Sequence, residues 1–297
     1  MHTALREGLT SPLFGPAMKM GQMVRQLLPG ALKNKVPART SARAKLWPQR
    51  EHPRKVLMLA GCVQPAMMPN VNSATARVLD AAGIQTVVAA KAGCCGALRT
   101  HLNDHSGGLH DMRNNVDAWW PYVERGEVEA IVMNASGCGV AVKEYGHALA
   151  GDPAYAAKAE RISELTRDLS ELLPDLVPLL EKKVKVGAVK ELAFHPPCTL
   201  QHGQQLRGGV ERHMNALGFK VGLATGESHL CCGSAGTYSV LQPKLAYQLR
   251  DRKLANLAPL EAQVIVSANI GCIQHLQTGT TTPVKHWVEV LDEALAS

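Results

Sequence analysis

Residues 92–98 read Ala-Gly-Cys-Cys-Gly-Ala-Leu, and residues 230–236 read Leu-Cys-Cys-Gly-Ser-Ala-Gly. In each place a tandem cysteine pair is followed by glycine, a third cysteine lies 32 or 33 residues before the pair, and a fourth lies 43 or 40 residues after it. Cysteines that act only as small buried side chains need no such spacing. Because the pair, the glycine and the intervals recur together, we infer an internal duplication. Its two sets are Cys62, Cys94, Cys95 and Cys138, and Cys198, Cys231, Cys232 and Cys272.

Short apolar runs alternate with helical stretches around both cysteine sets. Strands that alternate with helices imply parallel sheets, so we predict an α/β fold with two tandem duplicated domains, each a small parallel sheet flanked by helices. The boundaries that we expect are a basic N-terminal connector at residues 1–50, a first domain at residues 51–185 and a second domain at residues 186–297. The predicted strands are residues 55–60, 84–89, 130–133, 191–194, 219–223 and 263–267. The predicted helices are residues 72–82, 104–123, 204–217, 243–257 and 286–296.

Every cysteine position comes just after one of the predicted strands. Ligands of an open parallel sheet bind outside the carboxyl ends of its strands, so the four thiols of each copy should gather at one sheet edge. The helices that follow begin at this edge, and their N-terminal dipoles favour the thiolate over the thiol. Four thiolates at one point make a metal site, and we therefore predict such a site in each copy.

The cysteine spacing favours an iron–sulfur cluster over zinc. Four thiolates suit either group, but structural zinc sites normally use Cys-x₂₋₄-Cys pairs, which neither copy contains. Adjacent cysteines direct their side chains differently, which suits a cluster several ångströms across better than a single ion. Zinc remains the alternative cofactor. A disulfide within a tandem pair is disfavoured, because it would strain the intervening peptide bond.

The positive charge is confined to one end of the chain. The sequence has 32 Lys and Arg, 25 Asp and Glu and a net charge of +7, but residues 1–50 alone contain nine Lys and Arg and one acidic residue, Glu7. The remainder is nearly neutral, which argues against a basic nucleic-acid-binding face, and we expect no nucleic-acid partner. No stretch resembles a signal peptide, and no window approaches 18 uncharged apolar residues.

We therefore expect a cytoplasmic protein without a transmembrane segment, with peripheral attachment to the inner face of the cell membrane as a further option. In such a compartment, cysteines are more often ligands or redox groups than structural disulfides. Near the N-terminus, Leu13, Ala17, Met20, Val24 and Leu27 share one helical face. We expect this helix to cover a core or to contact another domain, and a basic amphipathic membrane anchor is the alternative.

The repeated pattern of a cysteine, a Cys-Cys-Gly triplet and a final Gly-Cys resembles the cysteine-rich CCG domain. This domain occurs in heterodisulfide reductase B-type subunits, lactate-utilisation proteins and iron–sulfur subunits of flavin-linked dehydrogenases. The resemblance covers residues 50–297, and several stretches are especially similar to the iron–sulfur subunits of bacterial glycolate oxidases. These stretches are residues 59–65, 92–98, 133–138, 195–200, 231–238 and 267–272.

This resemblance implies an electron-transfer component of an oxidoreductase complex, with no catalytic residue of its own. In this family, partner subunits carry FAD and oxidise a 2-hydroxy acid. The iron–sulfur subunit accepts their electrons and passes them towards a quinone or another membrane acceptor. All eight cysteines are then metal ligands, and each set of four suits one [4Fe–4S] cluster.

The sequence departs from the wider family in two places. Heterodisulfide-type domains end each copy with Cys-x-x-Cys, but the last position here is Ala141 or His275, so a five-thiolate non-cubane cluster is not expected. His275 is a candidate extra ligand, although a structural role is the favoured interpretation, and His195 and His229 are candidate hydrogen-bond donors to a cluster. The two clusters of the ferredoxin-like region at the N-terminus of family members are not expected in this sequence, because no cysteine precedes Cys62.

Two other functions fit the same residues. One is a catalytic CCG-type reductase, similar to heterodisulfide reductases or lactate-utilisation proteins, that acts at an open cluster site. The other is a scaffold subunit that is stabilised by zinc or holds no metal. Iron and sulfide analysis with EPR distinguishes these alternatives best.

Overall fold

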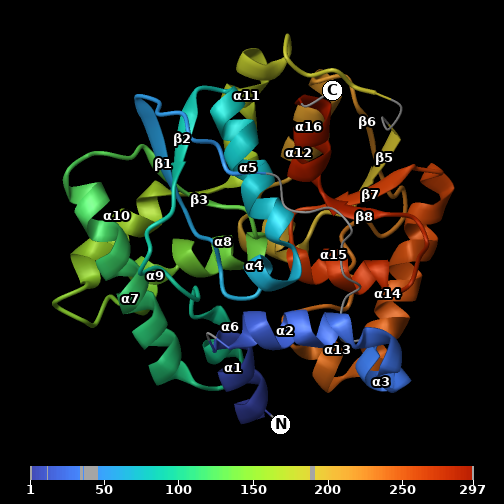
Figure 1. Ribbon diagram of the computed structural model, residues 1–297, viewed down its shortest axis with the longest axis horizontal. Coiled ribbons are helices and arrows are strands. Elements are labelled where there is room, and N and C mark those ends of the chain that lie inside the picture. Colours follow the sequence, from blue (N-terminus) through green and yellow to red (C-terminus); the bar gives the residue numbers. More distant parts are fainter. Residues whose placement is uncertain (1, 12, 34–35, 37–45, 188–190, 296–297) are drawn as a thin grey trace.

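The computed structural model describes residues 2–11, 13–33, 36, 46–187 and 191–295, and Figure 1 shows their arrangement. These residues form two four-stranded sheets with the strand orders β2-β1-β3-β4 and β6-β5-β7-β8. All neighbouring strands are parallel. The predicted α/β fold of two duplicated units, each with a parallel sheet flanked by helices, is therefore confirmed.

The first unit consists of the first sheet and its connecting helices. Its strands are β1 (Arg54–Met58), β2 (Ile84–Val87), β3 (Ala130–Met133) and β4 (Thr166–Asp168). Its helices are α4 (Gln64–Met67), α5 (Pro69–Ala81), α6 (Ala97–His101), α7 (His105–Glu124), α8 (Ser136–Lys143), α9 (Tyr145–Ala148), α10 (Ala156–Leu165), η2 (Leu169–Leu172) and α11 (Leu173–Leu180).

The second unit repeats this plan. Its strands are β5 (Glu191–Phe194), β6 (Lys220–Leu223), β7 (Val264–Ser267) and β8 (Val284–His286). Its helices are η3 (Thr199–Gly203), α12 (Gly209–Ala216), α13 (Tyr238–Leu241), α14 (Pro243–Leu257), η4 (Ala258–Leu260), α15 (Ile270–Gln277) and α16 (Trp287–Leu295).

The predicted strands agree closely with those observed, but one predicted helix begins late, and helices α8, α10, α11 and α15 were not expected. All six predicted strands are present, and their ends differ from the prediction by at most two residues. The helix expected at residues 204–217 begins only at Gly209, because Gly208 has a positive φ of +74° and residues 199–203 form a separate helical turn. Strands β4 and β8 were not expected. Each is three residues long and has a charged middle residue, Arg167 or Lys285, so no apolar run reveals it.

The glycine after each tandem cysteine pair is required by the backbone. Gly96 and Gly233 have φ angles of +86° and +89°, a region that residues with a Cβ atom rarely adopt. An added Cβ atom would also lie 2.7 Å from the carbonyl oxygen of Gly108 in α7, or 2.4 Å from that of Ala246 in α14. Each glycine therefore lets the long helix of its unit pack directly against the cysteine loop.

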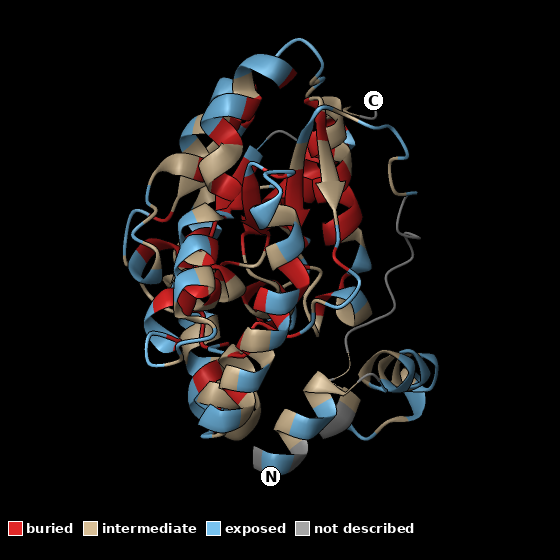
Figure 2. Ribbon diagram, turned by 90° about the vertical axis from the view of Figure 1, so that its left-hand side faces the viewer, coloured by how far each residue is buried: buried red, intermediate tan, exposed pale blue. Residues whose placement is uncertain are grey.

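The two units pack against each other through equivalent helices. Helix α5, which follows β1, contacts α16 of the second unit, and α12, which follows β5, contacts α11 of the first unit. Arg77 of α5 forms an ion pair with Asp292 of α16, with 2.7 Å between Nη2 and Oδ2. One continuous apolar core extends from β1 and β3 through these helices to the second sheet, and Figure 2 shows the buried residues in the middle of the molecule. Hydrophobic burial therefore joins the two units.

The N-terminal helices lie across the edge of the first sheet where the cysteine loops are found. Arg99 of α6 forms an ion pair with Glu7, with 3.0 Å between Nη1 and Oε1, and the second N-terminal helix contacts α4. Figure 1 shows the first two of these helices below α6 and α4. The N-terminal helices are α1 (His2–Thr10), α2 (Phe14–Met23), η1 (Arg25–Leu27) and α3 (Gly30–Lys33).

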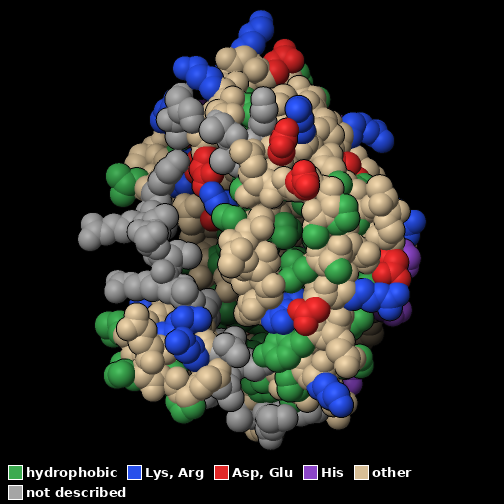
Figure 3. Space-filling model, turned by 90° about the vertical axis from the view of Figure 1, so that its right-hand side faces the viewer, with side chains coloured by type: hydrophobic (Ala, Val, Ile, Leu, Met, Phe, Trp, Pro, Cys, Tyr) green, Lys and Arg blue, Asp and Glu red, His purple; other side chains and the backbone are tan. Residues whose placement is uncertain are grey.

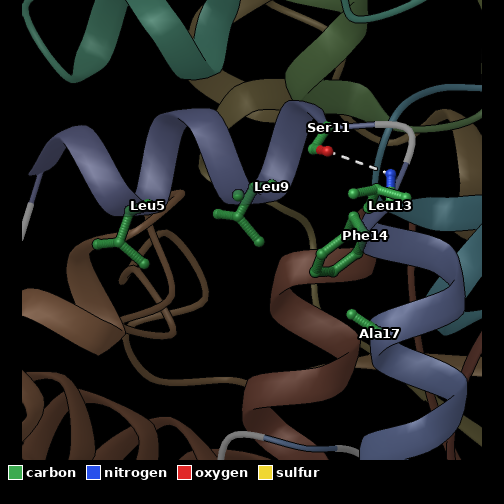
Figure 4. Close-up of a pocket in the computed structure, with 7 residues that line it drawn as sticks. Leu5, Leu9, Ser11, Leu13, Phe14 and Ala17 are labelled. Carbon is green, nitrogen blue, oxygen red and sulfur yellow. Dashed lines mark hydrogen bonds between the residues drawn. The ribbon is translucent and has the colours of Figure 1, made fainter.

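The apolar face predicted for the N-terminal segment covers no core in the described part of the chain. Leu13, Met20 and Leu27 are 72%, 62% and 86% exposed. Figure 4 shows side chains of α1 and α2, among them Leu9 and Phe14, lining an apolar pocket. On the face in Figure 3, basic and acidic side chains are interspersed. None of the described helices has the length and apolar composition that a membrane crossing needs.

Candidate metal centres

The first cysteine set gathers at the carboxyl edge of the first sheet. Cys62 follows β1, Cys94 and Cys95 follow β2, and Cys138 lies in the first turn of α8, after β3. Hydrogen bonds from the thiols of Cys62 and Cys95 lower the pKa of Cys94 to about 3. The bond to Cys94 raises the pKa of Cys62, and bonds to Cys138 and Cys94 raise that of Cys95. The first thiolate therefore forms at Cys94, between two thiol donors.

The second set has the same arrangement at the edge of the second sheet. Cys198 follows β5, Cys231 and Cys232 follow β6, and Cys272 lies in the first turn of α15, after β7. Hydrogen bonds from Cys198 and Cys232 lower the pKa of Cys231 to about 2. The backbone N–H of Gly233 also donates to Cys231 Sγ over 3.3 Å. The hydrogen bond with Cys232 lowers the pKa of Cys272 to about 6. The structure thus brings together the four thiols of each predicted set.

The donor chemistry of both sets suits an iron–sulfur cluster. All eight cysteines are free thiols. A tetrahedral zinc ion with Zn–S bonds of about 2.3 Å requires all four sulfurs to lie about 3.8 Å apart. Among the described residues, the one trio of candidate ligands whose donor atoms all lie within 4.8 Å of one another is His195, Cys232 and Cys272. The four sulfurs of each set are therefore more widely spread than a single ion requires, and they suit a larger cluster.

His195 is a buried neighbour of the second set. Its side chain is fully buried, and neither ring nitrogen has a nitrogen or oxygen partner among the described residues. A buried polar group without a partner costs about 1–3 kcal/mol. The ring faces the sulfurs of Cys232 and Cys272 instead, and its hydrogen bond helps to keep the pKa of Cys272 low, after the larger contribution of Cys232.

A buried lysine also accompanies the second set. Lys253 of α14 is 1% exposed, and its Nζ donates to the carbonyl oxygens of Glu227 at 2.8 Å and Ser228 at 3.1 Å. These two residues belong to the loop before Cys231. Burial lowers the pKa of Lys253, whereas the nearby cysteine thiolates, foremost Cys198, oppose this shift. A positively charged side chain is thus held beside the sulfurs by backbone carbonyl groups.

The corresponding neighbours of the first set are uncharged. Asn115 of α7 is fully buried; its Oδ1 accepts from the backbone N–H of Gly93 at 2.8 Å, and its Nδ2 donates to the carbonyl oxygen of Cys94 at 2.7 Å. The hydroxyl of Tyr145 donates to the carbonyl oxygen of Cys95 at 2.9 Å. These bonds fix the cysteine loop through its backbone and place no charge beside the sulfurs.

A carboxylate lies beside the first set. Burial, followed by the charge of the Cys94 thiolate, raises the pKa of Asp111 to about 6. Its Oδ2 lies 3.4 Å from Arg99 Nε, and Arg99 also pairs with Glu7 and Asp104 at 3.0 Å each. The guanidinium group is therefore shared among three carboxylates and cannot neutralise all of them.

The other two predicted histidines have different surroundings. Nε2 of His275 is 3.0 Å from the carbonyl oxygen of Ala246, and its ring stacks on Tyr247 with 5.9 Å between ring centroids. This nitrogen therefore faces α14 and not the cysteines. His229 is exposed at the surface. Of the three histidines singled out from the sequence, His195 has a ring nitrogen within 4.8 Å of two cysteine sulfurs.

The charged neighbours of the sulfurs were not predicted from the sequence. Lys253 lies in a helix that also contains Lys244, Arg250 and Arg252, so no local pattern marks it as the buried base. Asp111 lies in helix α7, which also contains several charged residues of both signs. Counted from the glycines of the repeated Cys-Cys-Gly triplets, Asn115 lies opposite Arg252, one residue before Lys253, so the sequence does not pair the asparagine with the lysine.

Known proteins match the chain over both cysteine sets. The family described as "Cysteine-rich domain" matches residues 56–143 and 192–277. The glycolate oxidase iron–sulfur subunit of Escherichia coli strain K12 is 50% identical over 296 residues, which cover 98% of this chain and 71% of that protein. The probable glycolate oxidase iron–sulfur subunit of Bacillus subtilis strain 168 is 26% identical over 226 residues, which cover 76% of this chain and 50% of that protein.

A shorter type of protein aligns over nearly all of its own length. Lactate utilization protein A of Bacillus velezensis is 29% identical over 248 residues, which cover 80% of this chain and 99% of that protein. The duplicated cysteine-rich architecture is thus shared with both types of relative, but the identity to the Escherichia coli subunit is much higher. The chain therefore belongs to the family of glycolate oxidase iron–sulfur subunits, which carries two cysteine-rich CCG domains.

Proposed function

We propose that this protein is the iron–sulfur electron-transfer subunit of a glycolate-oxidase-like complex. The observation that carries the proposal is the gathering of four free thiols at the same edge of each of two sheets. The identity of 50% to a glycolate oxidase iron–sulfur subunit supports it. The chain is then one component of an oxidoreductase, and the oxidation of the 2-hydroxy acid belongs to partner subunits that carry FAD.

Each cysteine set is proposed to hold one [4Fe–4S] cluster, which supplies one-electron redox chemistry when it is bound. The protein contributes sulfur ligands that are readily deprotonated, because the thiolate is the form that binds metal. It also limits access of water. Four of the eight ligands are at most 8% exposed, and the other four are partly exposed. The buried ligands are Cys94, Cys95, Cys232 and Cys272.

The contact between the two units supports electron transfer from one site to the other. Ser136, two residues before Cys138, and Thr199, directly after Cys198, have their hydroxyl oxygens 2.7 Å apart. Asn269 Nδ2 also donates to the hydroxyl of Thr199, over 3.3 Å. The backbone of Ser136 also bonds the second unit, because its N–H donates to the carbonyl oxygen of Ala268 over 3.0 Å. These hydrogen bonds connect the loops that carry ligands of the two sets and give electrons a short route between the units.

The proposed partners lie on both sides of this route. FAD-containing dehydrogenase subunits are the electron donors, and a quinone or another membrane acceptor receives the electrons. We place the protein in the cytoplasm, attached peripherally to the inner face of the cell membrane. Within the chain, residues 1–50 are proposed to be a basic connector, residues 51–185 the first cluster-binding domain and residues 186–297 the second.

Anaerobic purification of the full chain tests the proposal. Two [4Fe–4S] clusters predict about eight iron and eight acid-labile sulfide ions per chain, with EPR signals after reduction. Cys94→Ala and Cys231→Ala should each remove about half of the iron. His229→Ala is the matched control, because this exposed residue lies two positions before Cys231. Stoichiometric zinc without iron would contradict the proposal.

The role in electron transfer needs a separate experiment. When the protein is mixed anaerobically with its FAD subunits, addition of the 2-hydroxy acid should bleach the cluster absorbance and produce the EPR signals of the reduced state. The double variant with Cys94→Ala and Cys231→Ala should show neither change. If the acid is oxidised but the clusters stay oxidised, the protein does not act as the acceptor subunit.

One observation favours a second candidate, in which the second unit holds zinc. His195, Cys232 and Cys272 form a buried trio of zinc-type ligands with donor atoms within 4.8 Å of one another. Metal analysis distinguishes the two possibilities directly. A mixed protein would contain about four iron ions and one zinc ion per chain, and His195→Ala would release the zinc and leave the iron in place.

A further inference from the structure

We propose that the second cysteine set holds its cluster at a higher reduction potential than the first, so that electrons flow from the first unit to the second. His195 and Lys253 are the residues that set this order. The inference rests on the proposed function and adds a direction to it. In the transfer, the site of the first unit is oxidised by one electron and the site of the second unit is reduced by the same electron.

His195 occupies a position that is apolar in the first unit. Its backbone N–H donates to the carbonyl oxygen of Val266, from β5 to β7, over 2.8 Å. The backbone N–H of Leu59 makes the equivalent bond to Val132, from β1 to β3, over 3.3 Å. Both residues lie three positions before the first cysteine of their set. The second set therefore has a buried imidazole at the point where the first set has a leucine.

Lys253 has an uncharged counterpart in the first unit. The glycine of each Cys-Cys-Gly triplet packs against the carbonyl oxygen of Gly108 in α7 or of Ala246 in α14, so these two positions are equivalent. Seven residues further along each helix lie Asn115 and Lys253. Both side chains hydrogen-bond the backbone of the loop that leads to the tandem cysteines, but only the lysine adds a positive charge.

The charged groups around the two sets differ in sign. The ion-pair network that reaches the first set has three carboxylates and two guanidinium groups, and its formal charge is −1. Beside the second set, Glu227 is paired with Arg252. Among the described residues, the ammonium group of Lys253 donates only to carbonyl oxygens, so these three side chains have a formal charge of +1. The network of the first set consists of Arg6, Glu7, Arg99, Asp104 and Asp111.

This difference in charge changes the reduction potentials, because a cluster gains one negative charge when it accepts an electron. A nearby positive charge stabilises the reduced form, and a nearby carboxylate destabilises it. Lys253 is almost completely buried, so water and salt screen its charge little. Hydrogen bonds to the ligand sulfurs also favour the reduced form, and His195 is the buried donor that faces them. Both residues therefore raise the potential of the same site.

A potentiometric titration of the whole chain, followed by EPR at pH 8, tests which cluster is reduced first. Cys94→Ala and Cys231→Ala assign each EPR signal to its set by removing it. In the unaltered protein, the signal of the second set should appear first as the potential is lowered. Lys253→Met should lower that midpoint potential by at least about 59 mV, which corresponds to a tenfold change in the one-electron equilibrium constant. The midpoint potential of the first set should stay unchanged.

Further variants separate an electrostatic role from a structural one. Lys244→Met removes an exposed charge from the same helix and should leave both midpoints unchanged. His195→Leu, which introduces the residue type of the first unit, should lower only the second midpoint, whereas His195→Gln, which keeps an N–H donor, should lower it less. If Lys253→Met does not fold, the order of reduction in the unaltered protein and the midpoint potentials of the His195 variants still test the inference.

The outcomes distinguish this inference from the proposed function. If the protein holds two clusters and the first set is reduced before the second, the inference is wrong but the proposed function stands. Unchanged midpoints in both Lys253→Met and His195→Leu would also overturn it, because the order would then have another cause. A protein without iron would overturn the proposed function and, with it, the inference.

Discussion

The two units of this protein share their backbone and their four cysteines, but not the residues packed around the sulfurs. In both units the cysteines follow the first three strands, and a glycine with positive φ lets a long helix approach the tandem pair. The first unit adds Asn115 and Asp111 to this frame, whereas the second adds Lys253 and His195. The shared residues are those that build a thiol-rich site, and the different ones are those that adjust its electrostatics.

The largest effect on stability is expected at the glycines of the Cys-Cys-Gly triplets. Gly96→Ala and Gly233→Ala should each lower the free energy of unfolding by roughly 2–5 kcal/mol, because a positive φ and a backbone clash combine. The loss should be greater at Gly233, where the added Cβ atom would lie 2.4 Å from a carbonyl oxygen, against 2.7 Å at Gly96. Urea unfolding followed by circular dichroism measures both.

A third glycine separates the two causes. Gly83 also has a positive φ, of +79°, but an added Cβ atom would meet nothing within 4 Å. Gly83→Ala should therefore cost only the part due to backbone strain, on the order of 1 kcal/mol. If all three substitutions cost the same, close packing against α7 and α14 is not what requires glycine in the triplets.

The next largest effect is expected in a buried polar network of the first unit. Asn134 Nδ2 donates to Asn72 Oδ1 at 2.9 Å and to Thr75 Oγ1 at 3.0 Å, and its Oδ1 accepts from Gln64 at 2.8 Å. Counting back four residues from the last cysteine, the second unit has Ala268 instead. Asn134→Ala should cost roughly 2–4 kcal/mol, because it leaves buried amide groups without partners.

Chemical denaturation of Asn134→Ala and of Asn134→Asp tests this expectation. The aspartate variant keeps the shape of the side chain but cannot donate hydrogen bonds when it is ionised, so it should be at least as unstable. Surface substitutions usually change the free energy of unfolding by up to about 0.5 kcal/mol. If Asn134→Ala lowers it by less than this amount, the network adds little to the stability of the first unit.

The free energy of unfolding is expected to change with pH by about 2 kcal/mol because of His286, which ends a fourth strand. Asp168 ends β4 and His286 ends β8; each accepts a hydrogen bond from the backbone N–H two residues ahead. Burial lowers the pKa of His286 to about 3, whereas a histidine in the unfolded chain titrates near pH 6.5. The unfolded chain therefore binds a proton that the folded protein refuses, and stability is lost as the pH falls from 6.5 towards 3.

Between pH 7 and pH 5 this linkage predicts a loss of about 2 kcal/mol from His286. His286→Phe keeps a ring next to Trp287 and removes the titrating group, so its stability should depend less on pH in this range by about the same amount. The comparison of pH slopes, and not of absolute stabilities, is the measurement. A variant with the slope of the unaltered protein would show that other groups cause the acid sensitivity.

The smallest effect is expected where the two units meet. Ser136→Ala and Thr199→Val should each cost about 1 kcal/mol, because they remove the 2.7 Å hydrogen bond between the two cysteine loops. A double-mutant cycle isolates this bond, and its coupling energy should also be about 1 kcal/mol. Additive effects would mean that the two hydroxyl groups do not depend on each other. The same variants should slow electron exchange between the sites if the proposed route is used.

Most of the fold could be predicted because its signals are local. Apolar runs of four to six residues mark β1, β2, β3 and their counterparts β5, β6 and β7. The fourth strands lack such runs, but the last residue of each, Asp168 or His286, begins a capping pattern that both units share. The backbone N–H of Asp168 donates to Glu171, and that of His286 donates to Glu289, three residues ahead in each unit. This spacing is a signal that could have found β4 and β8 in the sequence.

The candidate sites were predicted in part. Their cysteines could be assigned to two sets because parallel strands deliver the residues that follow them to one edge. The orientation of the histidines could not, because a ring within a few residues of a cysteine can face the sulfurs, as His195 does after β5, or a neighbouring helix, as Nε2 of His275 in α15 does. That choice depends on which helix packs over each position, and no local pattern encodes it.

The duplicated α/β fold and the two sets of four cysteines follow from the amino-acid sequence alone, because spacing along the chain and strand periodicity are local properties. The differences between the two sets follow from how the chain packs. The burial of Lys253, the ring of His195 with no other polar partner and the sharing of Arg99 among three carboxylates all arise from contacts between segments far apart in the sequence. Charge acts through distance and burial, and these are set by packing.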